Sequence, residues 1–258
     1  MLHLIRPPLA TCLPDAALQD RYEVWRATKI KDLAPNSPLI TSRWDQFVRG
    51  AGEAREVGPA LLTAVKGWQH NKCAWCESVE PRTVDHVELK AQVPRRMFDW
   101  DNLLASCGDC NNARSHYEVA HEILVVPTRD EPLKHFRWDA KTGECVFEPA
   151  DTRALETVRA LAMHRFQNER LHKLQRFRTY LAFLLIDVQR DRTLDLLREE
   201  LEPKRPYLCI LRSWLLHPPD DDARALRDLA FAREPVLFEW VRPWLLPWAA
   251  ASWPISTG

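Results

Sequence analysis

Glycine and net charge are what this 258-residue sequence has least of. It contains seven glycines, against 19 prolines and 11 tryptophans. So few glycines argue against a barrel or sandwich rich in tight turns, whereas many prolines suit short helices that end sharply. Lys plus Arg equal Asp plus Glu, at 36 each. Because proteins that bind nucleic acid unaided usually have a basic excess, any such excess must be local here or come from another subunit.

The sequence also lacks a long apolar run. The run 180–186 stops at Asp187, far short of the roughly 20 residues that cross a bilayer. At the N-terminus, Arg-Pro-Pro at 6–8 interrupts a short apolar start, and no small-residue cleavage site follows. We therefore expect a cytoplasmic protein without membrane contact, whose cysteines stay reduced.

Breaks and periodicities divide the chain into three stretches. Residues 1–70 are expected to form a helical segment that packs on the core, with helices from Pro14 to about Ile30 and from Pro59 to near Asn71, and a loop between them. Residues 71–149 carry the motifs. Residues 150–258 are expected to be wholly helical, with Asp151 as an N-cap.

Short alternating segments predict the strands of the middle stretch. Residues 83–88 suit a strand, 111–123 a helix and 123–126 another strand. Residues 136–138 and 145–147 predict the two arms of a hairpin. The expected fold class is therefore α+β and mainly helical.

Four of the seven cysteines form two CxxC pairs separated by 30 residues: Cys73 and Cys76, then Cys107 and Cys110. Each pair presents two sulfurs to one ion, and two pairs complete a tetrahedral site, so we expect Zn²⁺. Four protein ligands leave no open position for water or substrate, so the zinc is expected to be structural. Redox-active cysteines are the alternative, but a thioredoxin-type motif has no matching second pair.

Residues with the chemistry of phosphodiester hydrolysis lie around these pairs. Asp85 and His86 fall on the expected strand, Asn102 precedes the second pair and Asn111 follows it. Hydrolysis needs a base to activate water, a cation for the developing charge, and groups that hold both. Each residue also has an ordinary interpretation: Asp85-His86 as a surface turn, Asn102 as a turn cap, and Asn111 as a helix N-cap.

The order CxxC, Asp-His, Asn, CxxC-Asn resembles the ββα-metal motif of HNH endonucleases. The resemblance implies His86 as the general base and Asp85 as a ligand of a catalytic Mg²⁺ or Mn²⁺. It implies that Asn102 ties the loop and orients His86 through backbone hydrogen bonds. Asn111 occupies the final position, where many members have a metal-binding His, and His116 is the alternative ligand. An amide oxygen is a hard ligand, which favours Mg²⁺ over softer metals.

A narrower likeness covers about residues 1–185. Segments 5–9, 72–77, 104–113 and 124–127 are similar to those of the nuclease subunits of Septu systems and of certain retron operons, which are bacterial anti-phage systems. This resemblance implies a DNA-cutting effector that acts with an ATPase partner of the ABC/SMC type. The family often has Lys-Gly shortly after the last Asn, whereas this chain has Arg114-Ser115. Arg114 is therefore a candidate for the phosphate contact by position alone.

Basic residues are not gathered around the motifs. Residues 66–118 include seven Lys or Arg and eight Asp or Glu, whereas 159–178 include six basic residues and one acid. Arg170, Lys173 and Arg176 recur every three residues, and they could contact phosphate, form a solvated helix face or cover apolar surface. The C-terminal tail is rich in tryptophan, which suits either a partner-docking surface or the packing of short helices. These residues are Trp240, Trp244, Trp248 and Trp253.

Two rival functions stay open from the sequence. The first is a non-catalytic zinc module that binds nucleic acid or a partner protein. The second is an HNH-like toxin that cleaves RNA or tRNA. The sequence also leaves open a homodimer.

Overall fold

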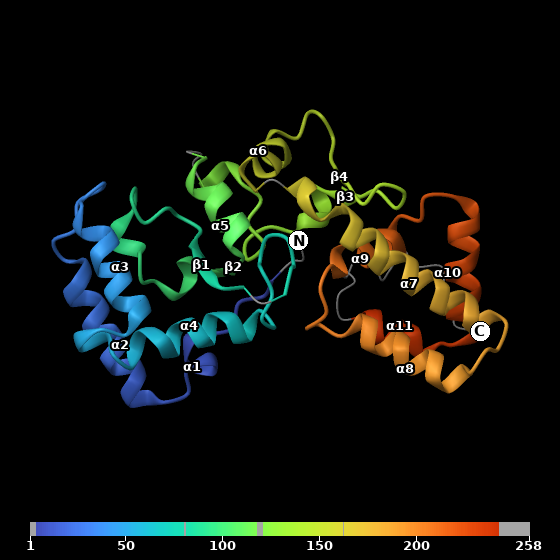
Figure 1. The fold of residues 1–258 in the computed structure, drawn as a ribbon, viewed down its shortest axis with the longest axis horizontal. Coiled ribbons are helices and arrows are strands. Elements are labelled where there is room, and N and C mark those ends of the chain that lie inside the picture. The colour runs from blue at the N-terminus through green and yellow to red at the C-terminus, as the bar shows by residue number, and fades with distance from the viewer. Residues whose placement is uncertain (1–3, 80, 118–120, 162, 243–258) are drawn as a thin grey trace.

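The computed structural model describes residues 4–79, 81–117, 121–161 and 163–242, and helices dominate it (Figure 1). The N-terminal part contains α1 (Leu9–Cys12), α2 (Ala16–Ile30), α3 (Leu39–Arg49) and α4 (Val57–Trp68). The two helices predicted there are confirmed as α2 and α4. Asp15 caps α2 by accepting the Leu18 N–H at 3.1 Å. Asn71, near which the second helix was expected to end, has a left-handed backbone, with φ of 54°.

The prediction of a loop between these two helices is wrong for the central part of that segment, where α3 forms. Gly50 ends α3 in the left-handed conformation, with φ of 62°. A Cβ at Gly50 would lie 2.8 Å from the Arg55 carbonyl oxygen, so glycine is needed there. Ile40 and Phe47 bury one face of the helix. The prolines and glycines therefore mark the ends of a short helix rather than a long loop.

A small antiparallel sheet and a helix lie at the centre of the molecule (Figure 1). Strand β1 (Thr83–His86), which was predicted, pairs with β2 (Leu103–Ser106), and His86 stands opposite Leu103. The 3-10 turns Pro94–Arg96 and Trp100–Asn102 lie in the connecting loop. Helix α5 (Gly108–Ser115) follows β2 and contacts β1. It begins earlier than predicted, because the Cys107 sulfur caps it by accepting the Cys110 N–H at 3.4 Å, and it also ends earlier, at Ser115.

The strand expected at 123–126 does not form. A 3-10 turn (His121–Ile123) leads into Leu124, Val125 and Val126, which are buried. However, the Val125 N–H donates to Thr157 Oγ1 and the Val126 N–H to Asp130 Oδ2, both at 2.8 Å. Their backbone donors are therefore bound by side chains rather than by a neighbouring strand. A short apolar run predicts burial but not the bonding partner.

The later part of the chain follows the prediction as far as residue 242, and residues 243–258 lie outside the described part. Strands β3 (Arg137–Trp138) and β4 (Cys145–Val146) form the expected hairpin. Asp151 Oδ1 accepts the Ala154 N–H at 2.9 Å, as expected of an N-cap. Trp240 packs partly buried against the core, whereas Trp244, Trp248 and Trp253 lie outside the described residues. The helices are α6 (Thr152–Leu161), α7 (Gln167–Leu185), α8 (Arg190–Leu201), α9 (Leu208–Leu216), α10 (Asp221–Arg233) and α11 (Val236–Val241).

The hydrophobic core has two parts, one on each side of the small sheet. Side chains alternate along a strand. Leu103 and Ala105 of β2 pack with the N-terminal helices, and Leu104 packs with the cysteine pairs and the C-terminal helices. The sheet and α5 are thereby fixed between two groups of helices (Figure 1). None of the described helices combines the length and the apolar character that a membrane span requires.

Candidate functional site

The two CxxC pairs meet in one cluster. The sulfurs of the four cysteines all lie within 4.8 Å of one another, and the Sγ atoms of Cys76 and Cys107 are 3.7 Å apart. Tetrahedral zinc with Zn–S bonds of about 2.3 Å places its sulfurs about 3.8 Å apart. The cluster could therefore hold one zinc ion. Cys73, Cys76 and Cys110 are each 1% exposed, so solvent reaches little of it.

Backbone hydrogen bonds shape the first pair and attach it to the sheet. The Cys73 N–H donates to the Ser78 carbonyl at 2.9 Å, and the Glu77 N–H donates to the Cys73 carbonyl at 3.0 Å. Glu77 takes a left-handed backbone, with φ of 64°, which turns the chain back on itself. The Ala74 N–H donates to the carbonyl of Ala105 in β2 at 2.9 Å. The two cysteines are thus presented from a rigid turn on the sheet.

Asp85 is a buried carboxylate on β1. Its Oδ2 accepts the indole N–H of Trp75 at 2.8 Å, and its Oδ1 accepts the His86 N–H at 2.7 Å. Burial raises the pKa of Asp85 to about 6, against the opposing charge of Arg114 and these hydrogen bonds. Arg114 is itself fully buried and donates to the Val87 carbonyl at 3.3 Å, so it does not extend toward a phosphate in solvent. A carboxylate in this setting would be stabilised by a cation.

His86 is 3% exposed and lies under Trp44 of α3, with ring centroids 4.4 Å apart. Its Nε2 lies 2.9 Å from the Met97 carbonyl oxygen. A carbonyl can only accept, which assigns the proton to Nε2 and leaves the lone pair on Nδ1. Burial, assisted by the charge of Lys90, lowers the pKa of His86 to about 3. The imidazole is therefore neutral at ordinary pH and able to accept a proton at Nδ1.

Asn102 is fully buried and closes the loop between β1 and β2. Its Oδ1 accepts the Glu88 N–H at 2.7 Å, and its Nδ2 donates to the carbonyls of Glu88 and Arg96, both at 3.0 Å. Arg96 directly precedes Met97, whose carbonyl accepts from His86. One amide side chain thus fixes the backbone on both sides of the imidazole.

Asn111 lies on α5, the helix that contacts β1. It is half-buried, and its side chain makes no hydrogen bond to any described residue. The interpretation of Asn111 as an N-cap is wrong, because Cys107 caps the helix. His116, the alternative ligand, is exposed just past the end of α5, and its Nδ1 lies 2.7 Å from the Asn112 carbonyl oxygen.

Of the three roles left open for the basic residues of α7, the structure favours packing for Arg170 and Lys173. Arg170 is fully buried and donates to the Met163 carbonyl at 2.9 Å. Lys173 is 1% exposed and pairs with the Glu200 carboxylate. Arg176 is exposed, but it pairs with the same carboxylate at 2.8 Å. Two of the three side chains therefore serve the packing of α7 against its neighbours, as long arginine and lysine side chains can.

Three residues near the site were not anticipated from the sequence. Trp75 bonds Asp85, and its position inside a CxxC pair was the available signal. Lys90, four residues after His86, lies with its Nζ 6.0 Å from the ring centroid of Trp44. Trp44 itself carried no signal, because only the fold brings α3 to the sheet.

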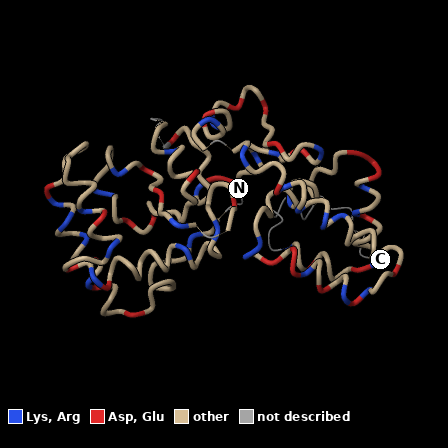
Figure 2. The backbone as a smooth tube through the Cα atoms, in the orientation of Figure 1, with Lys and Arg blue, Asp and Glu red and all other residues tan. Residues whose placement is uncertain are grey.

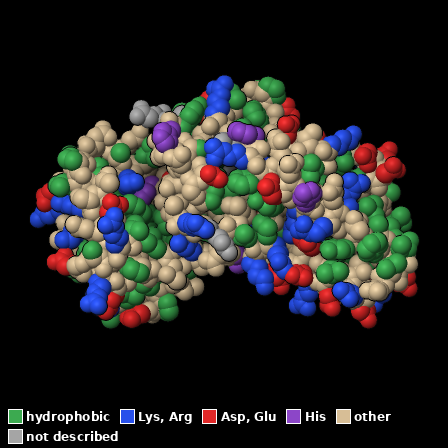
Figure 3. Space-filling model, viewed as in Figure 1, with side chains coloured by type: hydrophobic (Ala, Val, Ile, Leu, Met, Phe, Trp, Pro, Cys, Tyr) green, Lys and Arg blue, Asp and Glu red, His purple; other side chains and the backbone are tan. Residues whose placement is uncertain are grey.

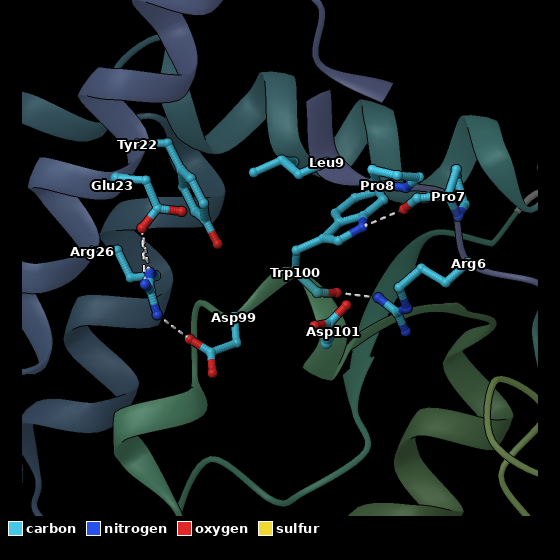
Figure 4. A pocket seen from close by; sticks show the side chains of 10 residues that line it. All are labelled: Arg6, Pro7, Pro8, Leu9, Tyr22, Glu23, Arg26, Asp99, Trp100 and Asp101. Carbon is cyan, nitrogen blue, oxygen red and sulfur yellow. Dashed lines mark hydrogen bonds and ion pairs between the residues drawn. The ribbon is translucent and has the colours of Figure 1, made fainter. Parts of the chain in front are cut away.

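A cavity of about 490 Å³ lies apart from these residues, beside the N-terminal segment (Figure 4). Two of its basic side chains already have partners. Arg26 bonds both Glu23 and Asp99, and Arg6 donates to the Trp100 carbonyl. The cavity thus reflects how the N-terminal segment is held against the loop before β2.

No family model matches the sequence. A stretch of 84 residues is 30% identical to the Septu protein PtuB of Bacillus thuringiensis. The match covers 31% of this chain and 33% of that protein, so the chain spans about a third of the length of the relative it matches. The similarity supports a Septu-like resemblance for that part of the chain.

Proposed function

We propose that this protein is a metal-dependent HNH endonuclease that hydrolyses DNA phosphodiester bonds in anti-phage defence, together with an ATPase partner. The observation that carries the proposal is the placement of Asp85 and His86 on β1 and of Asn102 in the loop that leads to β2, with α5, the helix that carries Asn111, packed against β1. The partial identity to a Septu protein supports the defence setting.

His86 is the general base in this proposal. The Met97 carbonyl holds the Nε2 proton, so the attacking water loses its proton to Nδ1. A pKa of about 3 makes the imidazole a weak base in the free protein. A substrate phosphate beside the ring raises this pKa, because nearby negative charge favours the imidazolium.

Asp85 and Asn111 are the residues that would hold a divalent ion. A carboxylate and an amide oxygen are ligands that suit Mg²⁺ and Mn²⁺. The buried charge of Asp85 would gain a partner, and so would the amide of Asn111, which bonds to no described residue. The bound ion supplies positive charge against the charge that develops on the phosphate. Zinc on four sulfurs has no open position and is assigned a structural role.

The charge distribution supports action with a partner. Basic and acidic residues are interspersed along the chain (Figure 2) and on the face seen in Figure 3. Arg114, Arg170 and Lys173 are buried, which leaves Arg176 as the exposed member of the expected phosphate contacts. Phosphate neutralisation supplies most non-specific DNA affinity. A chain of balanced charge therefore needs a second protein, in our proposal an ABC/SMC-type ATPase encoded nearby, to bring it to DNA.

Phage infection of cells that carry the gene and its neighbours tests this proposal. The wild type is expected to protect, and His86→Ala is expected to abolish protection while the protein stays folded and zinc-loaded. Asn112→Ala changes an exposed residue of α5 and is the control that should still protect. Full protection by a folded His86→Ala protein would refute the nuclease and favour a non-catalytic zinc module.

A further inference from the structure

Trp75 connects the cysteine cluster to the carboxylate of Asp85. It lies between Cys73 and Cys76, and its side chain is completely buried. The indole Nε1–H donates to Asp85 Oδ2 at 2.8 Å, and Asp85 is 4% exposed. A single side chain therefore separates the four-sulfur centre from the proposed metal-binding carboxylate.

The direction of this indole depends on the fold of the first cysteine pair. That turn is fixed by its own backbone bonds and by the bond from Ala74 to Ala105 of β2. Ala105 stands opposite Val84 in the sheet, and Val84 directly precedes Asp85. A turn that opens when the sulfurs lose their ion would move the indole relative to the strand that carries the carboxylate.

The hydrogen bond also restricts what the carboxylate can do. An indole N–H can only donate, so it occupies one lone pair of Oδ2 at all times. With Oδ1 held by the His86 N–H, both oxygens of Asp85 are oriented before any ion arrives. Outer partners of this kind orient metal ligands, and their loss typically weakens metal binding by about 10–100-fold.

We propose that Trp75 is a positioning residue that couples occupancy of the cysteine centre to divalent-ion binding at Asp85. This inference rests on the proposed function, in which Asp85 is a metal ligand. Zinc bound by the four cysteines sets the turn, the turn aims the indole, and the indole holds the carboxylate. Loss of zinc thereby weakens the second metal site through Trp75.

Binding of Mn²⁺ to the zinc-loaded full chain, measured by titration calorimetry without nucleic acid, tests the coupling. Trp75→Phe keeps an aromatic ring and removes the donor. Its control is Trp214→Phe, because Trp214 is 1% exposed and its indole nitrogen has no hydrogen-bond partner in the described part of the chain. We expect the Mn²⁺ dissociation constant to rise about 10–100-fold in Trp75→Phe and to stay unchanged in Trp214→Phe.

The outcomes separate this inference from the proposed function. Equal Mn²⁺ affinity in wild type and a zinc-loaded Trp75→Phe protein overturns the coupling and leaves the nuclease proposal intact. A wild type that binds no Mn²⁺ overturns both.

A measurement on the wild type tests the inference even if the Trp75→Phe variant does not fold. Hydrogen exchange of the Trp75 indole N–H is expected to be slow with zinc bound and to become fast after zinc is chelated, while the Trp214 indole N–H stays slow. Protection of Trp75 that survives zinc removal would overturn the inference.

Discussion

Replacing Asn102 by alanine tests how the loop around His86 is held. The substitution removes three hydrogen bonds from a side chain with no solvent exposure: one from the Glu88 N–H and two to the carbonyls of Glu88 and Arg96. At about 1 kcal/mol for each net hydrogen bond, with a further cost for backbone groups left unbonded, we expect a loss of about 3–4 kcal/mol in the free energy of unfolding. If the loop opens locally, exchange of the Glu88 amide should rise about 100-fold.

Urea unfolding and amide hydrogen exchange of the zinc-loaded protein measure these effects. Asn112→Ala removes the same amide group from an exposed position and should change the unfolding free energy by no more than about 0.5 kcal/mol. A loss below about 1 kcal/mol in Asn102→Ala, with unchanged exchange at Glu88, would show that the loop does not depend on this side chain.

Three further predictions concern zinc, pH and burial. Chelation of zinc should destabilise the protein by on the order of 5 kcal/mol, measured by calorimetry alongside metal analysis; an unchanged melting temperature would contradict the structural role. Burial lowers the pKa of His86 from 6.5 to about 3. The unfolded chain therefore binds more protons in that window, and stability falls with falling pH by up to about 1.4 kcal/mol per pH unit more than in His86→Gln. Urea unfolding of both proteins at pH 7 and pH 5 measures this. An equal change in the free energy of unfolding between the two pH values in wild type and His86→Gln would refute it. Lys173→Ala should cost about 2–3 kcal/mol, because it removes the charge-assisted hydrogen bonds of a buried ammonium group while Arg176 still pairs with the Glu200 carboxylate. Arg176→Ala, at an exposed position, should cost less than about 1 kcal/mol, and equal losses in thermal unfolding would contradict the burial of Lys173.

The parts of the molecule that the sequence predicted are those fixed by local geometry. Two residues between paired cysteines confine both sulfurs to one turn, so the four-sulfur cluster followed from spacing. Asp151, the predicted N-cap, binds the Ala154 amide only three residues along the chain. The strand at Asp85 followed from alternation of apolar and polar residues.

The parts that the sequence did not predict depend on contacts between distant residues. A spacing of three residues predicted that Arg170 and Lys173 share one edge of a helix. Their burial depends on partners elsewhere in the chain, such as Glu200 on α8. Trp44 reaches His86 from α3, a helix that flanking prolines and glycines obscured. Periodicity indicates which residues share a face, and tertiary partners decide whether a charged side chain on that face is exposed.

Cleavage of duplex DNA by the zinc-loaded protein, with the partner ATPase present and Mg²⁺ added last, tests the central proposal most directly. The wild type and Asn112→Ala are expected to cut only after Mg²⁺ is added, and His86→Ala is expected to cut at least about 100-fold more slowly at the same zinc content. An RNA substrate run in parallel separates the toxin alternative, which predicts cutting of RNA in place of DNA. Undiminished DNA cleavage by folded His86→Ala would contradict the assignment of His86 as the base.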